Sequence, residues 1–209
     1  EVMWGDEQSE SDHRRQKLTV GIGRGEQIHA WLLRPNENNG RGPAILCLHQ
    51  TVPIGKDEPA GLGGKPTLHY ARELAARGYV CLVPDYPSFG EDQFDFAAHA
   101  ERWQSGTMKA IWNNHRCLDL LESRPDVNPD RIGVIGHSLG GHNALFTAAF
   151  DRRIAAVVTS CGFTGFHNYY GGNLAGWTSA RYMPRINDLY DNDPDRVPFD
   201  FHEVLGAIA

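Results

Sequence analysis

The residues with the clearest chemical potential lie in the segment 136–140, whose sequence GHSLG matches the pattern G-x-S-x-G. In this pattern a sharp turn between a strand and a helix exposes the serine hydroxyl, and the two glycines let strand and helix approach each other. The start of the helix then directs free N–H groups towards a developing oxyanion. An apolar run at 132–135 and a run of small residues at 143–150 supply the strand and the helix. The segment therefore predicts that Ser138 is a nucleophile.

The composition places limits on the class of protein. Of the 209 residues 41% are hydrophobic and 22% are charged, and the net charge is −6. Such values are typical of a globular protein, and the length suits one domain of medium size. The negative charge argues against nucleic acid or an anionic membrane as a partner. No apolar run approaches the roughly 20 residues that span a bilayer.

The cysteines and histidines show no metal-binding pattern. The four cysteines have neither C-x-x-C nor zinc-type spacing, and the ten histidines include no H-E-x-x-H motif. We therefore expect no metal and no other cofactor. Buried free thiols are the favoured interpretation, although a disulfide between Cys47 and Cys81 on neighbouring strands stays open. The compartment is also open, with a lean towards the cytoplasm.

Hydrophobic patterning divides the chain into alternating strands and helices. Residues 1–16 are polar and charged and are expected to form an N-terminal arm, followed by a single domain over 17–209. This domain should begin with an antiparallel hairpin that turns at 23–26. Further strands are expected at 43–49, 79–83, 132–135 and 154–160, and helices at 67–77, 107–122, 143–150, 181–190 and from Asp200, which forms a capping pair with Glu203. This order predicts a mostly parallel sheet with helices on both faces.

Several polar residues follow directly after predicted strands. Ligands of parallel sheets bind at the carboxyl ends of the strands. The loops after 49, 83, 135 and 160 open on that edge, so Gln50, Asp85, Ser138 and Cys161 are expected near one another.

With these residues in place, the chain resembles an α/β-hydrolase, and more narrowly the branch of serine esterases similar to dienelactone hydrolases and acetylxylan esterases. The resemblance rests on LHQT at 48–51, on GY at 78–79 followed by PDYP at 84–87, and on GHSLGG at 136–141. It implies an oxyanion hole built from the backbone amide of Leu139 and that of Gln50 or Thr51. It also implies that His49 is structural and that His137 points away from the serine.

A substrate pocket is expected beside the nucleophile. The candidates are Asp85 and Tyr86 after one strand, and the aromatic loop with Phe166, Tyr169, Tyr170 and Trp177 after another. The alternative is that these aromatic side chains only cover the sheet.

This chain departs from the family's catalytic triad after the serine. Family members carry Ser, then Asp or Glu, then His along the chain, whereas this sequence ends at Ala209, inside the last predicted helix. We therefore expect the last strands, the acid and the histidine to be missing. Of the remaining histidines, His167 is the best substitute base, ahead of His142 and His202. The strand 154–160 would then form an exposed apolar edge that favours self-association or a complementing chain.

Two functions follow from these observations. The first is a serine hydrolase that cleaves a small-molecule carboxylic ester through an acyl-enzyme on Ser138. The second is a catalytically incomplete fragment or a non-catalytic binding module, which keeps the scaffold but lacks a working base.

Overall fold

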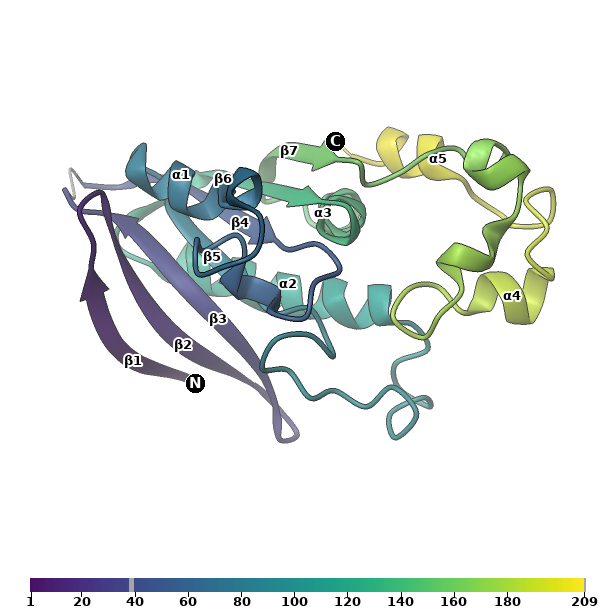
Figure 1. Cartoon of the computed structure of the whole chain (residues 1–209), viewed down its shortest axis with the longest axis horizontal. Coiled ribbons are helices and arrows are strands. Elements are labelled where there is room, and N and C mark those ends of the chain that lie inside the picture. Colours follow the sequence, from purple (N-terminus) through teal and green to yellow (C-terminus); the bar gives the residue numbers. More distant parts are fainter. Residues whose placement is uncertain (38–39, 209) are drawn as a thin grey trace.

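The computed structural model describes residues 1–37 and 40–208. Their backbone forms a seven-stranded mixed sheet in the order β1-β2-β3-β5-β4-β6-β7 (Figure 1). Three strands form an antiparallel ribbon at one side: β1 (Val2–Ser9), β2 (His13–Gly23) and β3 (Glu26–Pro35). Four parallel strands complete the sheet: β4 (Gly42–Leu48), β5 (Val80–Pro84), β6 (Val127–His137) and β7 (Ile154–Ser160).

The expected N-terminal arm is instead part of this sheet. Residues 1–16 form β1 and the first part of β2, with Val2 opposite Val20 and Ser9 opposite Arg14. The predicted boundary between 16 and 17 therefore cuts through a strand. The prediction of an arm was wrong because β1 is an edge strand whose side chains are nearly all exposed. Such a strand needs no apolar pattern in its sequence.

The hairpin between β2 and β3 confirms the turn predicted from its glycines. Gly23, Arg24 and Gly25 all have positive φ, at 89°, 56° and 76°. Such angles favour glycine and match the twist of the flanking strands.

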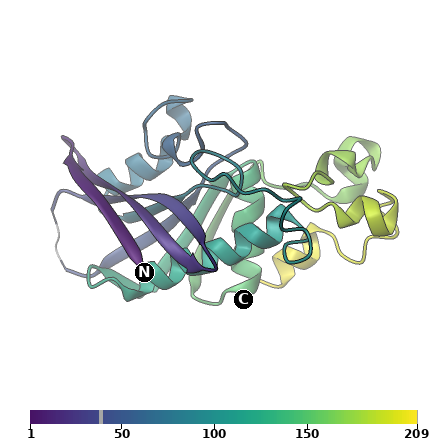
Figure 2. The same ribbon diagram turned by 90° about the horizontal axis from the view of Figure 1, so that it is seen from below.

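Helices cover both faces of the sheet, as predicted (Figure 2). One face carries α1 (Tyr70–Ala76), which packs on alternate residues of β4 and β5 such as Cys47, Cys81 and Val83. The other carries α2 (Gly106–Ser123) and α3 (Leu139–Phe150), which pack on the intervening residues, among them Leu46 and Leu82. Because successive side chains of a strand point to opposite faces, this split explains why these strands read as continuous apolar runs.

The residues after β7, 161–208, form an aromatic layer that packs against α3. It contains 3₁₀ turns at Phe166–Gly171 and Leu174–Trp177, then α4 (Arg185–Tyr190) and α5 (Phe201–Gly206). Asp200 and Glu203 form the predicted capping box at the start of α5. Phe166 and Phe201 are each 1% exposed and anchor this layer against α3.

Within the described residues, the sheet ends at β7. The pattern of β7 is apolar, yet Ala155 and Ala156 are exposed and Val158 is 52% exposed.

All four cysteines are free, and three of them are buried, so the structure contains no disulfide between Cys47 and Cys81. None of the helices in the described ranges is long and apolar enough to cross a bilayer.

Candidate active site

Ser138 sits at a strained turn between β6 and α3. Its backbone has φ 52° and ψ −116°, in a region that side-chain-bearing residues rarely adopt. The N–H of Ser138 donates a hydrogen bond of 2.7 Å to the carbonyl oxygen of Ser160, at the end of the neighbouring strand β7. The turn is therefore held by the sheet, and it projects the serine side chain beyond the carboxyl ends of the strands.

The glycines around Ser138 are required by close backbone contacts. A Cβ at Gly136 would overlap the carbonyl group of Gly140, and one at Gly140 would overlap the carbonyl oxygen of Leu48 at the end of β4. A Cβ at Gly141 would lie 2.8 Å from the Thr159 hydroxyl oxygen. Any side chain at these positions would separate β6, α3 and the end of β4, which explains the motif in physical terms.

The geometry leaves an amide available beside the serine. Leu139 is the first residue of α3, where a backbone N–H has no intrahelical acceptor. Gln50 and Thr51 follow the end of β4, against which Gly140 packs. Their side chains anchor this loop, since Gln50 Nε2 donates to Glu58 Oε2 at 2.8 Å and Thr51 Oγ1 lies 2.9 Å from Tyr182 Oη. Their part in an oxyanion hole stays a prediction.

A cavity of about 170 Å³ opens over Ser138. No charged side chain lines it among the described residues; its walls are Ser138, Leu139, His142, Cys161, Gly162, Tyr169, Gly176, Trp177 and Tyr182. The cavity therefore combines one nucleophilic hydroxyl with neutral, largely aromatic walls.

Two of the predicted aromatic residues line this cavity, and two do not. Tyr169 and Trp177 form part of its wall. Phe166 is buried in the aromatic layer, whereas Tyr170 is 83% exposed. The aromatic loop therefore both bounds the pocket and covers the core.

Asp85 and Tyr86 have roles different from the predicted one. The buried Asp85 carboxylate accepts from Lys56 Nζ at 2.7 Å and from the backbone N–H groups of Lys56 and Glu91. Tyr86 is buried and donates its hydroxyl to the carbonyl oxygen of Arg181, and burial raises its pKa. Neither residue lines the Ser138 cavity. Both hold loops in place, because Asp85 binds Lys56 and the Glu91 N–H while Tyr86 binds the carbonyl oxygen of Arg181.

The histidines next to the predicted oxyanion loop and the nucleophile are structural. His49 is buried; its Nε2 accepts from the Tyr86 N–H at 2.9 Å and its Nδ1 lies 2.6 Å from the Gln50 carbonyl oxygen. Burial lowers the pKa of His49 and keeps it neutral. The Nδ1 of His137 lies 3.0 Å from Ser160 Oγ.

His142 is the residue of this site that the sequence placed least well. The sequence ranked it below His167 as a substitute base, but it is fully buried and lines the Ser138 cavity. Its Nε2 lies 3.0 Å from Thr107 Oγ1, and its ring stacks on Trp177 with centroids 5.1 Å apart. Burial lowers its pKa to about 3, so it is neutral at ordinary pH. The signal in the sequence that could have placed His142 beside the cavity was its position one helical turn after Ser138.

His167 does not reach the nucleophile. Its side chain is 63% exposed, its Nε2 lies 3.4 Å from Asp195 Oδ1, and it is absent from the cavity wall. His202 is also exposed and pairs with Glu203. The structure therefore does not support His167 as a substitute base. The described residues also contain no cluster of three or more His, Cys, Asp or Glu side chains that could hold a metal ion.

Comparison with known proteins identifies the family. A family model described as "Glucuronyl esterase, fungi" matches residues 86–209, which is more than half of the chain and includes the Ser138 turn. The chain belongs to the glucuronyl esterase family. This member is also 32% identical over 159 residues to YtaP of Bacillus subtilis, provisionally assigned as a hydrolase. It is 35% identical over 144 residues to the quorum-quenching protein AidA of Acinetobacter baumannii.

Solved structures agree on the fold. A glucuronoyl esterase from Solibacter usitatus aligns over 100% of this chain with a TM-score of 0.69 and 18% identity. Acetyl xylan esterase 1 from a Thermoanaerobacterium species aligns over 99% with a TM-score of 0.65 and 20% identity. At this identity the likeness shows the fold alone. It confirms the predicted α/β-hydrolase fold.

The chain spans only part of each relative. The alignments cover 53% of YtaP and 40% of AidA, and 65% and 66% of the two solved esterases. The relatives also include S-formylglutathione hydrolase of mouse, which is 25% identical over 170 residues.

Proposed function

We propose that this protein is a serine hydrolase of carboxylic esters that works through an acyl-enzyme on Ser138. The observation that carries the proposal is the Ser138 turn, which combines a strained backbone, an adjacent helix N-terminus and a cavity of about 170 Å³. The relatives named as esterases support ester hydrolysis as the reaction class.

In the proposed reaction Ser138 Oγ attacks the acyl carbon while its proton passes to a general base. The carbonyl oxygen becomes an oxyanion that accepts hydrogen bonds from the Leu139 amide and from the amide of Gln50 or Thr51. The C–O bond to the alcohol then breaks and the alcohol leaves with a proton. Water attacks the acyl-enzyme and releases the acid. The neutral cavity favours an uncharged group beside the ester.

The general base of this reaction is proposed to lie outside residues 1–209. Within the described part of the chain, His49 and His137 are hydrogen-bonded elsewhere, and His142, with a pKa of about 3, is too weak a base to take the serine proton. A complementing segment that pairs with the exposed edge of β7 would approach the Ser138 turn, because Ser160 at the end of β7 binds the Ser138 N–H.

A fluorophosphonate probe with intact-mass detection tests this proposal, because it requires an activated serine. We expect slow single labelling of the 209-residue chain, no labelling of Ser138→Ala, and fast labelling when a complementing segment is supplied. Labelling of Ser138→Ala at the same rate would exclude Ser138 as the nucleophile.

The second candidate is a non-catalytic binding module. It is favoured by the weak basicity of His142, the histidine that the described residues place in the Ser138 cavity, and by the aromatic walls of that cavity. A chain that stays unlabelled with every complementing segment, yet binds neutral small molecules in this cavity, would support it.

A further inference from the structure

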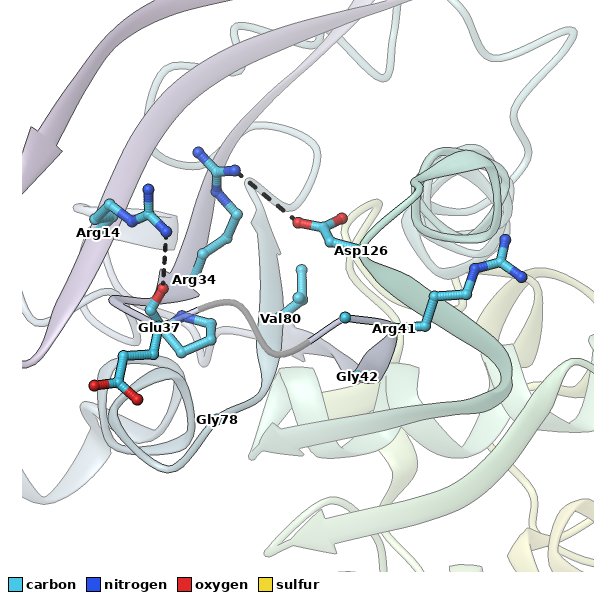
Figure 3. A pocket seen from close by; sticks show the side chains of 10 residues that line it. Arg14, Arg34, Glu37, Arg41, Gly42, Gly78, Val80 and Asp126 are labelled. Carbon is cyan, nitrogen blue, oxygen red and sulfur yellow. Dashed lines mark hydrogen bonds and ion pairs between the residues drawn. The ribbon is translucent and has the colours of Figure 1, made fainter.

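A second cavity lies at the opposite end of the sheet from Ser138. Its volume is about 130 Å³, and its walls include Arg14, Arg34, Glu37, Arg41, Val80 and Asp126 (Figure 3). Strands β4 and β5 begin beside it, at Gly42 and Val80, whereas Ser138 follows the end of β6. A strand of seven residues spans roughly 20 Å. The cavity is therefore separate from the candidate active site.

Two arginines of this cavity face each other across neighbouring strands. Arg14 of β2 and Arg34 of β3 are direct partners in the antiparallel register, so their side chains lie on the same face (Figure 3). Like charges in such a pair are destabilising unless a counter-charge is present. Glu7 of β1 supplies one: it pairs with Arg34 and lies 3.5 Å from Arg14 Nη1. One carboxylate thus serves two guanidinium groups.

The other carboxylates do not complete the neutralisation. Asp126 is held by both nitrogens of the Arg124 fork at 2.8 and 2.7 Å, and its oxygen lies 4.0 Å from Arg34 Nη1. Arg41 forms no ion pair among the described residues, and its side chain extends away from Arg14 and Arg34. Around Arg14 and Arg34, three arginines (with Arg124) therefore contact two carboxylates, Glu7 and Asp126, which leaves one positive charge in excess.

Hydrogen-bond donors are also left over. Arg14 binds the carbonyl oxygens of Pro35 and Asn36 through Nη2, at 3.4 and 3.1 Å, but its buried Nε has no protein partner. A buried donor without an acceptor costs roughly 1–3 kcal/mol. The planar guanidinium fork of Arg matches an oxyanion with two parallel N–H donors, which Lys cannot offer.

We propose that this cavity binds a small oxyanion, a phosphate or carboxylate group, between Arg14 and Arg34. The bound anion supplies the missing negative charge and accepts hydrogen bonds from the partly exposed guanidinium groups of Arg14 and Arg34. Glu37 on the cavity wall opposes it and limits its affinity. The site lies at the start of the parallel strands, so its ligand binds independently of the ester that Ser138 attacks.

Isothermal titration calorimetry with inorganic phosphate tests the site, at an ionic strength held constant with chloride. We expect saturable binding of one phosphate per chain. Arg14→Gln and Arg34→Gln should each weaken it by roughly tenfold or more, since each removes a charge-assisted contact. Glu37→Gln should strengthen it. The same titration with acetate shows whether the site binds a carboxylate or a phosphate more tightly.

Arg24→Gln is the matched control, because Arg24 is an exposed arginine at the other end of the β2–β3 ribbon and undergoes the same change of charge. It should bind phosphate as the unchanged chain does. Absence of saturable binding to both anions would overturn the proposal. Equal loss in Arg24→Gln would also overturn it, because binding would then follow net charge. If an arginine variant fails to fold, judged by circular dichroism, unchanged affinity in Glu37→Gln would still contradict the site.

Discussion

At the scale of single residues, the shape of the Ser138 turn depends on glycines, because the backbone around it leaves no room for a Cβ. Gly140 lies against the carbonyl oxygen of Leu48, so the second glycine of the motif joins α3 directly to the end of β4. The same contact brings the start of α3 next to the loop with Gln50 and Thr51. The nucleophile and the predicted oxyanion loop are thus linked through one backbone contact.

We expect Gly140→Ala to destabilise the fold by about 1–3 kcal/mol or more, since a methyl group there overpacks against backbone that cannot move aside. Urea unfolding followed by circular dichroism measures the change. Gly206→Ala is the control: nothing lies within 4 Å of its added Cβ in α5, and Ala is a better helix former than Gly. Equal stability of Gly140→Ala and the unchanged chain would contradict the tight packing described for this turn.

His142 gives a prediction for the dependence of stability on pH. Its folded pKa of about 3 lies below the unfolded value near 6.5, so the unfolded chain binds a proton that the folded chain excludes. Its contribution to stability is therefore present above pH 6.5 and is lost as the pH falls towards 3, by up to about 1.4 kcal/mol per pH unit.

His142→Gln keeps a polar group near Thr107 but removes this titration. Between pH 7.5 and 5, the free energy of unfolding should fall less in His142→Gln than in the unchanged chain, as measured by urea unfolding. His202→Gln, at an exposed histidine of α5, should keep the full dependence. An identical pH slope in His142→Gln would mean that His142 takes up its proton in the folded state.

At the scale of elements, one carboxylate links α5 to the 3₁₀ turn at Phe166–Gly171 within the aromatic layer. Asp200 caps α5 through the Phe201 N–H at 2.6 Å and also accepts from the Phe166 N–H at 2.9 Å. It therefore ties the last helix to the 3₁₀ turn that carries Tyr169, a residue of the cavity wall.

Asp200→Ala should cost about 1–2 kcal/mol of stability, because it removes the helix cap and leaves the Phe166 N–H without this acceptor. Denaturant unfolding measures the loss. Asp200→Asn keeps a cap acceptor and should retain most of the stability. If Asp200→Ala unfolds at the same denaturant concentration as the unchanged chain, the cap does not hold this layer.

The sequence predicted the elements whose signals are local and missed those decided by long-range contacts. The hairpin glycines, the apolar strands and the Asp200–Glu203 cap each follow from neighbouring residues, and all were confirmed. Strand β1 was missed because an exposed edge strand is specified by its partner β2 and not by its own pattern. Asp85 was wrongly predicted to line the pocket, because its ion-pair partner Lys56 lies far away in the sequence.

The candidate site divides in the same way. The geometry of Ser138 followed from a short motif, because glycines report directly on backbone contacts. The cavity wall followed only in part: Tyr169 and Trp177 were predicted, whereas Tyr182 reaches the wall only through the packing of the whole C-terminal layer, and Phe166 is buried in that layer.

At the scale of the whole molecule, the two edges of the sheet differ. The β1 edge carries the charged side chains of Asp6 and Glu7 among exposed residues, which guard an edge against pairing. The β7 edge carries exposed Ala155, Ala156 and Val158 and has no such guard. We therefore propose that β7 is where another segment or another copy pairs.

Val158→Lys should reduce self-association of the 209-residue chain, because a charge on an exposed edge strand opposes pairing. Analytical ultracentrifugation over a range of protein concentrations measures it. Met3→Lys is the matched control: Met3 is an apolar residue of β1 that is 53% exposed, against 52% for Val158. It should leave association unchanged. A strictly monomeric unchanged chain at all concentrations would contradict this role of β7.

The unlike edges also decide what form self-association takes. Fibres grow when one surface of a molecule fits a different surface of the next, so that the contact never closes. Here only one edge is open to pairing, and a strand that pairs with its own copy does so about a two-fold axis, with the two strands antiparallel. Each molecule then has no second surface to offer. Association through β7 therefore ends at a closed pair with a continuous sheet of fourteen strands, twice the seven of one chain.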